Sequence, residues 1–261
     1  MSLSTITQDV SVLINSCDKY ADVWPVFFAL FWKYWPDCPF PVYLGTNSRT
    51  WLDERVRVIK VGSDISWAET TLRMVSAVPT PYILWFLDDF LVWKHVDTPT
   101  VQSLFVEMKQ LNADYLRLRP LPRPDWPVPG HPRIGQIRPG APYRCALEIA
   151  FWRREVLMDL LAPGESPWDM EKAGSRRSDE RPGFYSTWKP VFKRTNGLER
   201  GKWILNNLPR LKREGISIPP DHVIMTLTEQ ISYWLRFHIY HVVLRCKTRL
   251  ERFMEFFRIH G

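Results

Sequence analysis

Residues 82–89 read YILWFLDD, a run of six apolar residues that ends in two adjacent aspartates. An unbroken apolar run of this length predicts a strand buried on both faces of a sheet. The carboxylates of Asp88 and Asp89 then stand where that strand ends. This stretch predicts the central strand of the fold, with an acidic pair at its carboxyl end.

The segments before this strand alternate between strand-type and helix-type patterns. Short β-branched runs predict strands, and apolar residues spaced three and four apart predict helices. The order strand–helix–strand–strand–helix–strand is typical of an α/β fold with a mostly parallel sheet covered by helices. The expected strands are Val10–Asn15, Pro41–Leu44 and Val56–Val61, and the expected helices are Tyr20–Tyr34 and Trp67–Val78.

After residue 90 the regular elements are separated by two irregular stretches, Pro120–Pro142 and Pro163–Pro182. Loops of that length usually cover active sites. The regular elements expected here are a helix over Thr98–Leu111, a strand over Tyr115–Leu118, a helix over Ile149–Leu161, and a strand or hairpin over Tyr185–Arg194.

The composition is that of an ordinary globular protein. The 261 residues are 45% hydrophobic and 24% charged, which excludes a disordered chain. The 35 Lys and Arg against 28 Asp and Glu give a net charge of +7, which favours anionic partners. Four scattered cysteines without a C-x-x-C pair favour a reducing cytoplasm over a disulfide framework or a zinc site. No apolar run is long enough to span a bilayer.

Polar clusters follow three of the predicted strands, at Asn15–Asp18, Thr46–Asn47 and Asp88–Asp89. In open parallel sheets, ligands bind outside the carboxyl ends of the strands. The sequence therefore predicts a ligand site at this edge of the sheet.

Asp88 and Asp89 are the candidate metal ligands. Adjacent carboxylates repel each other and cost stability unless a cation or hydrogen-bond donors compensate. A divalent ion, Mg²⁺ or Mn²⁺, bridged to phosphate oxygens would compensate them. The alternative is a helix cap or a turn acid, a role in which many Asp-Asp pairs are found.

These segments resemble a known family. Residues 12–47 (VLINSCDKYADVWPVFFALFWKYWPDCPFPVYLGTN) and residues 80–90 (TPYILWFLDDF) are similar to the nucleotide-sugar-binding half of GT-A glycosyltransferases, in particular bacterial enzymes of surface polysaccharide and lipopolysaccharide synthesis. The resemblance covers roughly residues 10–203 and implies a single Rossmann-like GT-A domain. In that family a strand-end D-x-D motif holds a divalent metal on the donor diphosphate. This chain has Leu87-Asp88-Asp89-Phe90 instead, which leaves open which aspartate binds the metal.

The resemblance also implies a donor site at the first two strand ends. Asn15, Ser16 and Asp18 would contact the base and ribose of the nucleotide, since a carboxylate accepts hydrogen bonds from ribose hydroxyls. Thr46, beside Asn47, would line the same pocket. Turn formation is an equally good interpretation for Ser16 and nearly as good a one for Thr46 and Asn47.

Three more residues complete the expected donor site. Trp67 and Arg73 belong to the helix that precedes the central strand, and Asp88 would contact the donor together with the metal. Arg73 is suited to a diphosphate because arginine pairs well with phosphate oxygens. The alternative for Arg73 is an ordinary surface arginine.

The stretch Pro167–Glu171 (PWDME) is the candidate for the catalytic base. An inverting enzyme needs a carboxylate that takes the proton of the acceptor hydroxyl. Glu171 is favoured over Asp169, and Trp168 offers an apolar face for a sugar ring. Alternatively the stretch opens a helix, and its acids interact with the helix dipole.

Glu148 precedes an apolar segment that is expected to be helical. It is either an acid in the first turn of that helix or a group that faces the transferred sugar.

The C-terminal part has a different character. Residues 223–259 contain no proline or glycine, and residues 231–261 carry six Lys and Arg against two Asp and Glu, interleaved with aromatics. A basic, aromatic amphipathic helix suits an anionic membrane surface. The alternative is a helix packed on the domain with its arginine stems along apolar surface. The expected division is a GT-A domain over residues 1–222 and a helical extension over residues 223–261.

The sequence thus predicts a glycosyltransferase that moves a sugar from a nucleotide diphosphate donor to a glycan or lipid-linked acceptor. It is expected to be metal-dependent and inverting, and to work in the cytoplasm or at the inner face of the cytoplasmic membrane. One alternative is a basic, non-catalytic protein that binds nucleic acid or membrane, although the strand-end acids would repel a phosphate backbone. The other alternative is a nucleotidyltransferase, but this sequence has no glycine-rich phosphate loop of the kind expected in that class.

Overall fold

The computed structural model describes residues 8–218, 223–236 and 239. The chain divides into two compact units, Met1–Asn196 and Gly197–Gly261. The domain boundary expected after residue 222 falls at residues outside the described part.

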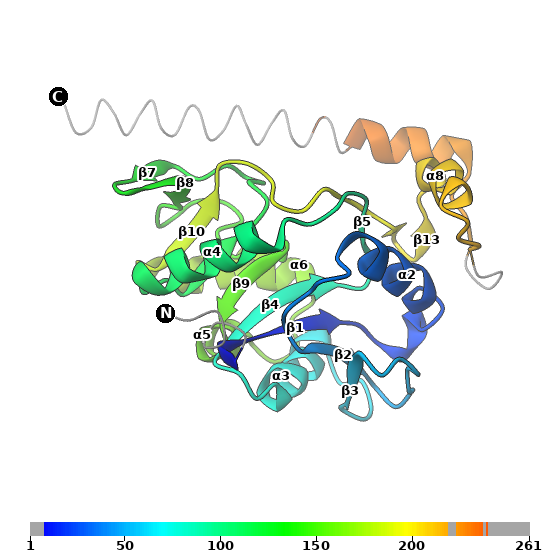
Figure 1. Ribbon diagram of the computed structural model, residues 1–261, viewed down its shortest axis with the longest axis horizontal. Helices are drawn as coiled ribbons and strands as arrows, with labels where there is room; N and C mark the ends of the chain where they lie inside the picture. The colour runs from blue at the N-terminus through cyan, green and yellow to red at the C-terminus, as the bar shows by residue number, and fades with distance from the viewer. Residues whose placement is uncertain (1–7, 219–222, 237–238, 240–261) are drawn as a thin grey trace. The chain divides into compact units, whose positions relative to one another are not determined.

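The first unit is built on a nine-stranded sheet with the order β3-β2-β1-β4-β9-β6-β10-β8-β7 (Figure 1). The strands β3, β2, β1 and β4 are all parallel, as are β6 and β10. β9 runs antiparallel to both of its neighbours, and the β8 and β7 edge is also antiparallel. The expected α/β class with a parallel, Rossmann-like sheet is therefore confirmed. Its strands are β1 (Val10–Asn15), β2 (Val42–Thr46), β3 (Val56–Lys60), β4 (Tyr82–Leu87), β6 (Tyr115–Arg117), β7 (Trp126–Val128), β8 (His131–Gln136), β9 (Ala150–Arg153) and β10 (Phe184–Thr187).

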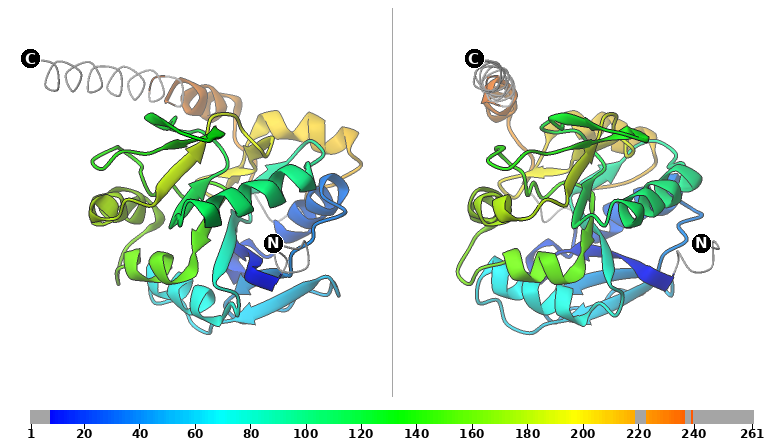
Figure 2. Two further views of the ribbon diagram at one scale, coloured as in Figure 1. Left: turned by 60° about the vertical axis from the view of Figure 1, so that its left-hand side comes forward. Right: turned by 90° about the vertical axis from the view of Figure 1, so that its left-hand side faces the viewer.

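Helices cover both faces of this sheet (Figures 1 and 2). On one face, side chains of α2 and α4 form a core with β1 and β4, and on the other face α3 and α5 do the same. The helices α3 and α4 each begin at a side-chain cap: Ser66 accepts from the amide of Glu69, and Asp97 from that of Thr100. The helices are α2 (Trp24–Tyr34), α3 (Trp67–Ala77), α4 (Thr98–Gln110), α5 (Arg154–Leu160), α6 (Pro167–Asp169) and α7 (Ser175–Arg177).

The helix expected over residues 149–161 is wrong in its first half. Residues Ala150–Arg153 form β9, and the helix α5 begins only at Arg154. Phe151 and Trp152 are fully buried because β9 lies between β4 and β6 with a core on each side. A short apolar run that is buried on both faces has no period that distinguishes a strand from a helix.

The irregular loop expected over residues 120–142 contains a β-hairpin. β7 and β8 pair antiparallel at the edge of the sheet, and Gly130, with a φ of +79°, lies in the turn. Pro127 fits in β7 because an edge strand does not need every backbone N–H. Gly135 is needed in β8, since a Cβ there would lie 2.6 Å from the Trp188 ring and 2.8 Å from Pro124.

Other boundaries differ by a few residues. α2 begins at Trp24 rather than at residue 20, because a 3₁₀ turn over Asp18–Tyr20 precedes it. β2 runs on through Thr46, where a turn is predicted. Near the end of the first unit, a short strand, β11 (Arg194–Asn196), pairs antiparallel with β5 (Phe90–Val92).

The second unit contains a small hairpin of β12 (Leu198–Glu199) and β13 (Lys202–Trp203), followed by the helix α8 (Leu208–Arg213). The chain is helical again over residues 227–236, which confirms part of the helix expected from residue 223 to residue 259. The expectation is wrong for residues 223–226, which are not helical because Ile224 forms an isolated β-bridge with Trp203. Beyond residue 236, only residue 239 of that expected helix is described. Among the residues that are described, no helix is both long and apolar enough to cross a membrane.

Candidate functional site

The strand ends bring the acidic pair and several charged side chains to one edge of the sheet. In the register of β1 and β4, Asn15 is paired with Leu87, so Ser16 and Asp88 follow side by side. β9 is antiparallel to β4, with Ala150 opposite Trp85, so Glu148, two residues before Ala150, lies at this edge as well.

Asp88 is held inward by a short hydrogen-bonded chain. The Trp24 indole Nε1 donates to the Ser16 hydroxyl at 2.7 Å, and that hydroxyl donates to the Asp88 Oδ2 atom. Asp88 is only 8% exposed. Burial, and then the charge of Asp89, raise the pKa of Asp88 to about 8, against the opposing effect of the Ser16 hydrogen bond. This carboxyl group is therefore a buried acid that is easily protonated.

Negative charge at this edge also acts on the neighbouring groups. The pKa of Tyr20 is raised by burial and by the charges of Cys17, Asp88 and Asp89. The pKa of the Cys17 thiol is likewise raised by burial and by Asp88. A cation bound here would relieve this repulsion, and Asp89 is the more exposed carboxylate of the pair.

The acidic pair offers such a cation two carboxylate ligands. Over the described ranges, no three His, Cys, Asp or Glu side chains are grouped so as to hold a metal ion. Mg²⁺ often takes only one or two carboxylates from the protein and completes its shell with water and substrate phosphates. Asp88 and Asp89 fit that mode of binding, in which the remaining ligands belong to a nucleotide.

Asp18 joins the end of β1 to the loop after β2. Its carboxylate accepts the backbone N–H groups of Asn47, Ser48 and Arg49 at 3.0–3.1 Å, and the Ser48 hydroxyl at 2.5 Å. Desolvation alone would raise the pKa of Asp18, but these hydrogen bonds together lower it. Asp18, which the sequence predicts as a contact of the nucleotide base and ribose, thus connects the end of β1 to the loop after β2.

The other predicted donor residues also make internal contacts. The Asn15 amide donates to the Thr71 hydroxyl of α3 at 2.8 Å, and the buried Thr46 hydroxyl donates to the carbonyl of Arg49 at 2.9 Å. Both therefore connect strand ends to neighbouring segments.

Trp67 and Arg73 lie on α3. The Trp67 ring packs edge-on against the buried Trp85 ring at 6.5 Å. Arg73 is exposed, and its Nη1 donates to the carbonyl of Val61 at 3.1 Å. Arg73 therefore tethers the end of β3 to α3, as an ordinary surface arginine does.

Glu148 stands between two arginines that come from distant parts of the chain. Its Oε1 atom lies 3.1 Å from Arg119 Nη1, and its Oε2 atom lies 2.5 Å from Arg194 Nη2. Burial alone would raise the pKa of Glu148, but the charges of Arg194 and Arg119 outweigh it and lower the pKa. The Cζ atom of Arg194 lies 3.6 Å from the centre of the Phe90 ring, which is a cation–π contact.

In this cluster of Glu148, Arg119 and Arg194, sequence reasoning named Glu148 but missed its two partners at this edge. Glu148 does not belong to the first turn of a helix, since β9 follows it. The buried Arg194 Nε has no hydrogen-bond partner in the described structure. The only sequence signal is that Arg119 follows a predicted strand, and nothing local links it to Arg194, 75 positions away.

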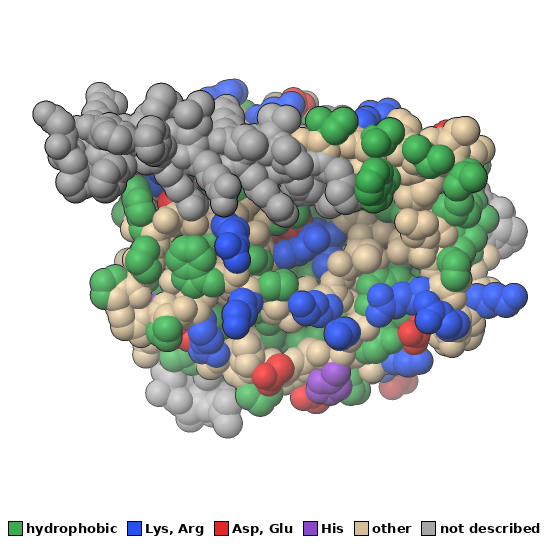
Figure 3. All heavy atoms as spheres, turned by 90° about the horizontal axis from the view of Figure 1, so that it is seen from above, with side chains coloured by type: hydrophobic (Ala, Val, Ile, Leu, Met, Phe, Trp, Pro, Cys, Tyr) green, Lys and Arg blue, Asp and Glu red, His purple; other side chains and the backbone are tan. Residues whose placement is uncertain are grey.

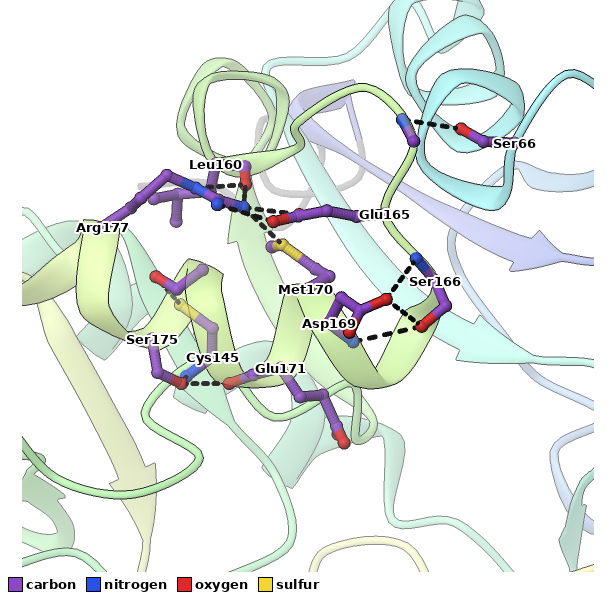
Figure 4. A network of polar contacts seen from close by, with 12 residues as sticks. Ser66, Cys145, Leu160, Glu165, Ser166, Asp169, Met170, Glu171, Ser175 and Arg177 are labelled. Carbon is purple, nitrogen blue, oxygen red and sulfur yellow. Dashed lines mark hydrogen bonds and ion pairs between the residues drawn. The ribbon is translucent and has the colours of Figure 1, made fainter.

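The structure separates the two candidate bases. Asp169 is exposed and forms a capping box with Ser166 at the start of α6, whereas the Glu171 side chain points away from that pair (Figure 4). Glu171 Oε1 accepts the backbone N–H of Leu147 at 2.8 Å, next to Glu148. Burial, and to a lesser degree Glu148, raise the pKa of Glu171. Glu171 therefore comes to the edge that carries the charged cluster, and Asp169 serves as a helix cap.

Positive charge is available for an anionic ligand. Figure 3 shows one face of the molecule on which Lys and Arg side chains gather. The arginines of the Glu148 cluster add positive charge beside the acidic pair.

Comparisons with known proteins give only distant similarities. No protein-family model matches this chain, and no curated protein matches it either. Among solved structures, it is similar to S. aureus TarS 1–349 (TM-score 0.44, 11% identity, 68% of this chain and 60% of that chain). It is also similar to TarS 1–349 in complex with UDP (TM-score 0.44, 10% identity, 68% and 60%) and to a cytidylyltransferase from Leptospira borgpetersenii (TM-score 0.43, 12% identity, 84% and 100%). The chain thus spans about 60% of the length of TarS 1–349, and likenesses this low do not show what it binds.

Proposed function

We propose that this chain is a glycosyltransferase that moves a sugar from a nucleotide diphosphate donor to a glycan or lipid-linked acceptor. The observation that supports the proposal is the gathering of Asp88, Asp89, Glu148 and Glu171 at the carboxyl edge of a parallel sheet. In an open α/β sheet this edge is where a nucleotide binds.

The acidic pair is assigned to the donor. Asp89, with Asp88 behind it, would hold a divalent ion whose charge neutralises the leaving diphosphate. The hydrogen bonds of Asp18 to the loop after β2, which we call the Asp18 clamp, and the Asn15–Thr71 hydrogen bond keep the strand ends rigid around that position. A rigid edge lowers the entropy cost of orienting the donor.

Glu171 is assigned as the base of an inverting transfer. Its carboxylate takes the proton of the acceptor hydroxyl while the acceptor oxygen bonds to the sugar C1 atom. The bond between C1 and the diphosphate oxygen breaks, and its electron pair leaves with the diphosphate. A pKa raised by burial suits this role because it makes the carboxylate a stronger base near neutral pH.

The donor assignment is tested by thermal shift with UDP, GDP, CMP and dTDP, each with and without Mn²⁺. A nucleotide at a hundred times its Kd should stabilise the folded state by about 2.7 kcal/mol. We expect one nucleotide to stabilise the wild type only with Mn²⁺, and Asp89→Asn to lose the effect. Asp169→Asn, an exposed acid away from the edge, is the matched control and should keep it. If no nucleotide raises the melting temperature under either condition, the proposal is wrong.

The base assignment is tested with the donor sugar that matches the nucleotide found. Glu171→Gln should lower kcat by roughly a hundredfold or more and leave the nucleotide shift intact, whereas Asp169→Asn should keep wild-type turnover. Identification of the product separates the alternative: nucleoside diphosphate indicates sugar transfer, and pyrophosphate released from a nucleoside triphosphate indicates a nucleotidyltransferase.

A further inference from the structure

Exposed hydrophobic side chains are concentrated in one short segment of the second unit. Eleven large hydrophobic side chains are exposed in the described structure, and seven of them lie within residues 223–239. Isolated exposed apolar residues are normal on a protein surface, but a contiguous group marks an interaction site. The seven are Val223, Ile224, Leu227, Ile231, Trp234, Leu235 and Ile239.

Five of these residues share one side of the helix that begins at residue 227 (orange in Figure 1). Leu227, Ile231, Trp234, Leu235 and Ile239 follow spacings of four, three, one and four. At about 100° per residue, these positions fall within an arc of about 140°. They are between 46% and 66% exposed, so this arc is an apolar face in contact with water. We name these five residues the apolar face.

The other side of the helix is the side that packs. Gln230 is only 6% exposed, and Glu229 beside it lines a cavity of about 300 Å³ together with residues of the β12–β13 hairpin. Lys202 of that hairpin pairs with Glu229 at 2.6 Å. A surface helix normally buries its apolar stripe and exposes its polar one. Here the apolar stripe is exposed, and the ion pair and the buried Gln230 lie on the opposite side.

The charge of this unit indicates what covers the apolar face. Residues 197–261 carry 11 Lys and Arg against 6 Asp and Glu, so they hold five of the seven excess positive charges of the chain. A second copy of this chain would bring the same positive charge to the interface and be repelled. An anionic lipid surface attracts this charge, and Trp234 suits the boundary between headgroups and acyl chains.

We propose that the apolar face inserts into the surface of an anionic lipid bilayer, to which the net positive charge of residues 197–261 attracts it. The helix then lies in the plane of the bilayer surface and does not cross it. The proposal does not depend on the enzymatic activity proposed above, because it requires neither a nucleotide nor the acidic edge of the sheet.

The test is sedimentation of the full chain with vesicles of phosphatidylcholine alone and of phosphatidylcholine with 30% phosphatidylglycerol. We expect binding to the anionic vesicles that weakens as salt is added. Leu227→Ser/Ile231→Ser/Leu235→Ser should weaken that binding roughly tenfold or more, because apolar insertion contributes in proportion to area. The matched control is Leu52→Ser/Ile65→Ser, which removes two exposed apolar side chains of the first unit and should bind as wild type.

The three replaced side chains are exposed, so the triple variant should melt at the wild-type temperature. If the triple variant melts at a lower temperature, the vesicle measurement is repeated with Leu227→Ser/Leu235→Ser, which replaces fewer side chains. Wild-type binding to vesicles by the triple variant would overturn the proposal, as would no binding by the wild type. A wild-type dimer in light scattering that the triple variant dissociates would also overturn it, since a second copy would then cover the face.

Discussion

Asp88 is an acid placed where its ionised form is poorly solvated. Its pKa in the folded protein is about 8, well above the ordinary value of 3.8. The folded state therefore binds this proton more tightly than the unfolded chain, and ionisation of Asp88 lowers stability as the pH rises from about 4 to about 8. The neutral form carries no such penalty.

We predict that Asp88→Asn removes this loss. The variant amide can still accept from Ser16, so the variant should be about 1–3 kcal/mol more stable than wild type at pH 8, with the difference vanishing near pH 4. Urea denaturation at pH 4.5, 6 and 8 measures the change. Asp37→Asn, at an exposed acid, is the control and should follow the wild-type pH dependence. Parallel pH curves for Asp88→Asn and wild type would contradict the prediction.

The two arginines on Glu148 differ in burial, and their removal should differ in cost. The Arg194 side chain is 3% exposed and the Arg119 side chain 28%. Arg194→Met leaves a buried carboxylate with one partner and should cost about 3 kcal/mol. Arg119→Met should cost about 1 kcal/mol, because water can replace that guanidinium.

A double variant tests whether the unpaired buried charge causes this loss of stability. Glu148→Leu/Arg194→Met removes both buried charges and should recover most of the stability lost in Arg194→Met. Denaturant melts of the four proteins measure this. Equal losses in the two single arginine variants, or no recovery in the double variant, would show that the buried charge is not the cause.

At the scale of elements, Asp18 connects the turn after β1 to the loop after β2 through hydrogen bonds to three successive amides. We predict that Asp18→Ala speeds hydrogen exchange at Asn47, Ser48 and Arg49 and lowers stability by about 1 kcal/mol, a small value because water screens this half-exposed group. The amide of Leu13, inside β1, should stay protected. Unchanged exchange at residues 47–49 would mean that other contacts hold the loop.

The elements also show where local patterns succeed. β1 and β4 have the bounds expected from the sequence, because short apolar runs next to polar clusters have clear ends. β9 and the β7–β8 hairpin were not expected. Their residues form strands only because neighbouring strands supply hydrogen bonds and the core covers both faces of β9. Such pairing partners are distant in sequence, so no local window contains them.

At the scale of the whole molecule, the candidate site combines residues that sequence could and could not bring together. The acidic pair at the end of β4 follows from the sequence, because a strand end and its polar cluster are adjacent in the chain. The preference for Glu171 over Asp169 as the base stays a prediction, and the contact of Glu171 with Leu147 at the edge of the sheet supports it. The pairing of Glu148 with Arg119 and Arg194 depends on three segments meeting in space.

The sequence by itself therefore determined the α/β class, the central strand and the acidic edge, because apolar periodicity and strand ends are local properties of the chain. Only the tertiary structure decided that Asp18 is a clamp, that Glu148 is paired with two arginines, and that the apolar face of residues 227–239 points outward. Each of these depends on which groups desolvate one another across the fold. Burial and charge pairing are set by packing between segments far apart in the chain, which no local pattern contains.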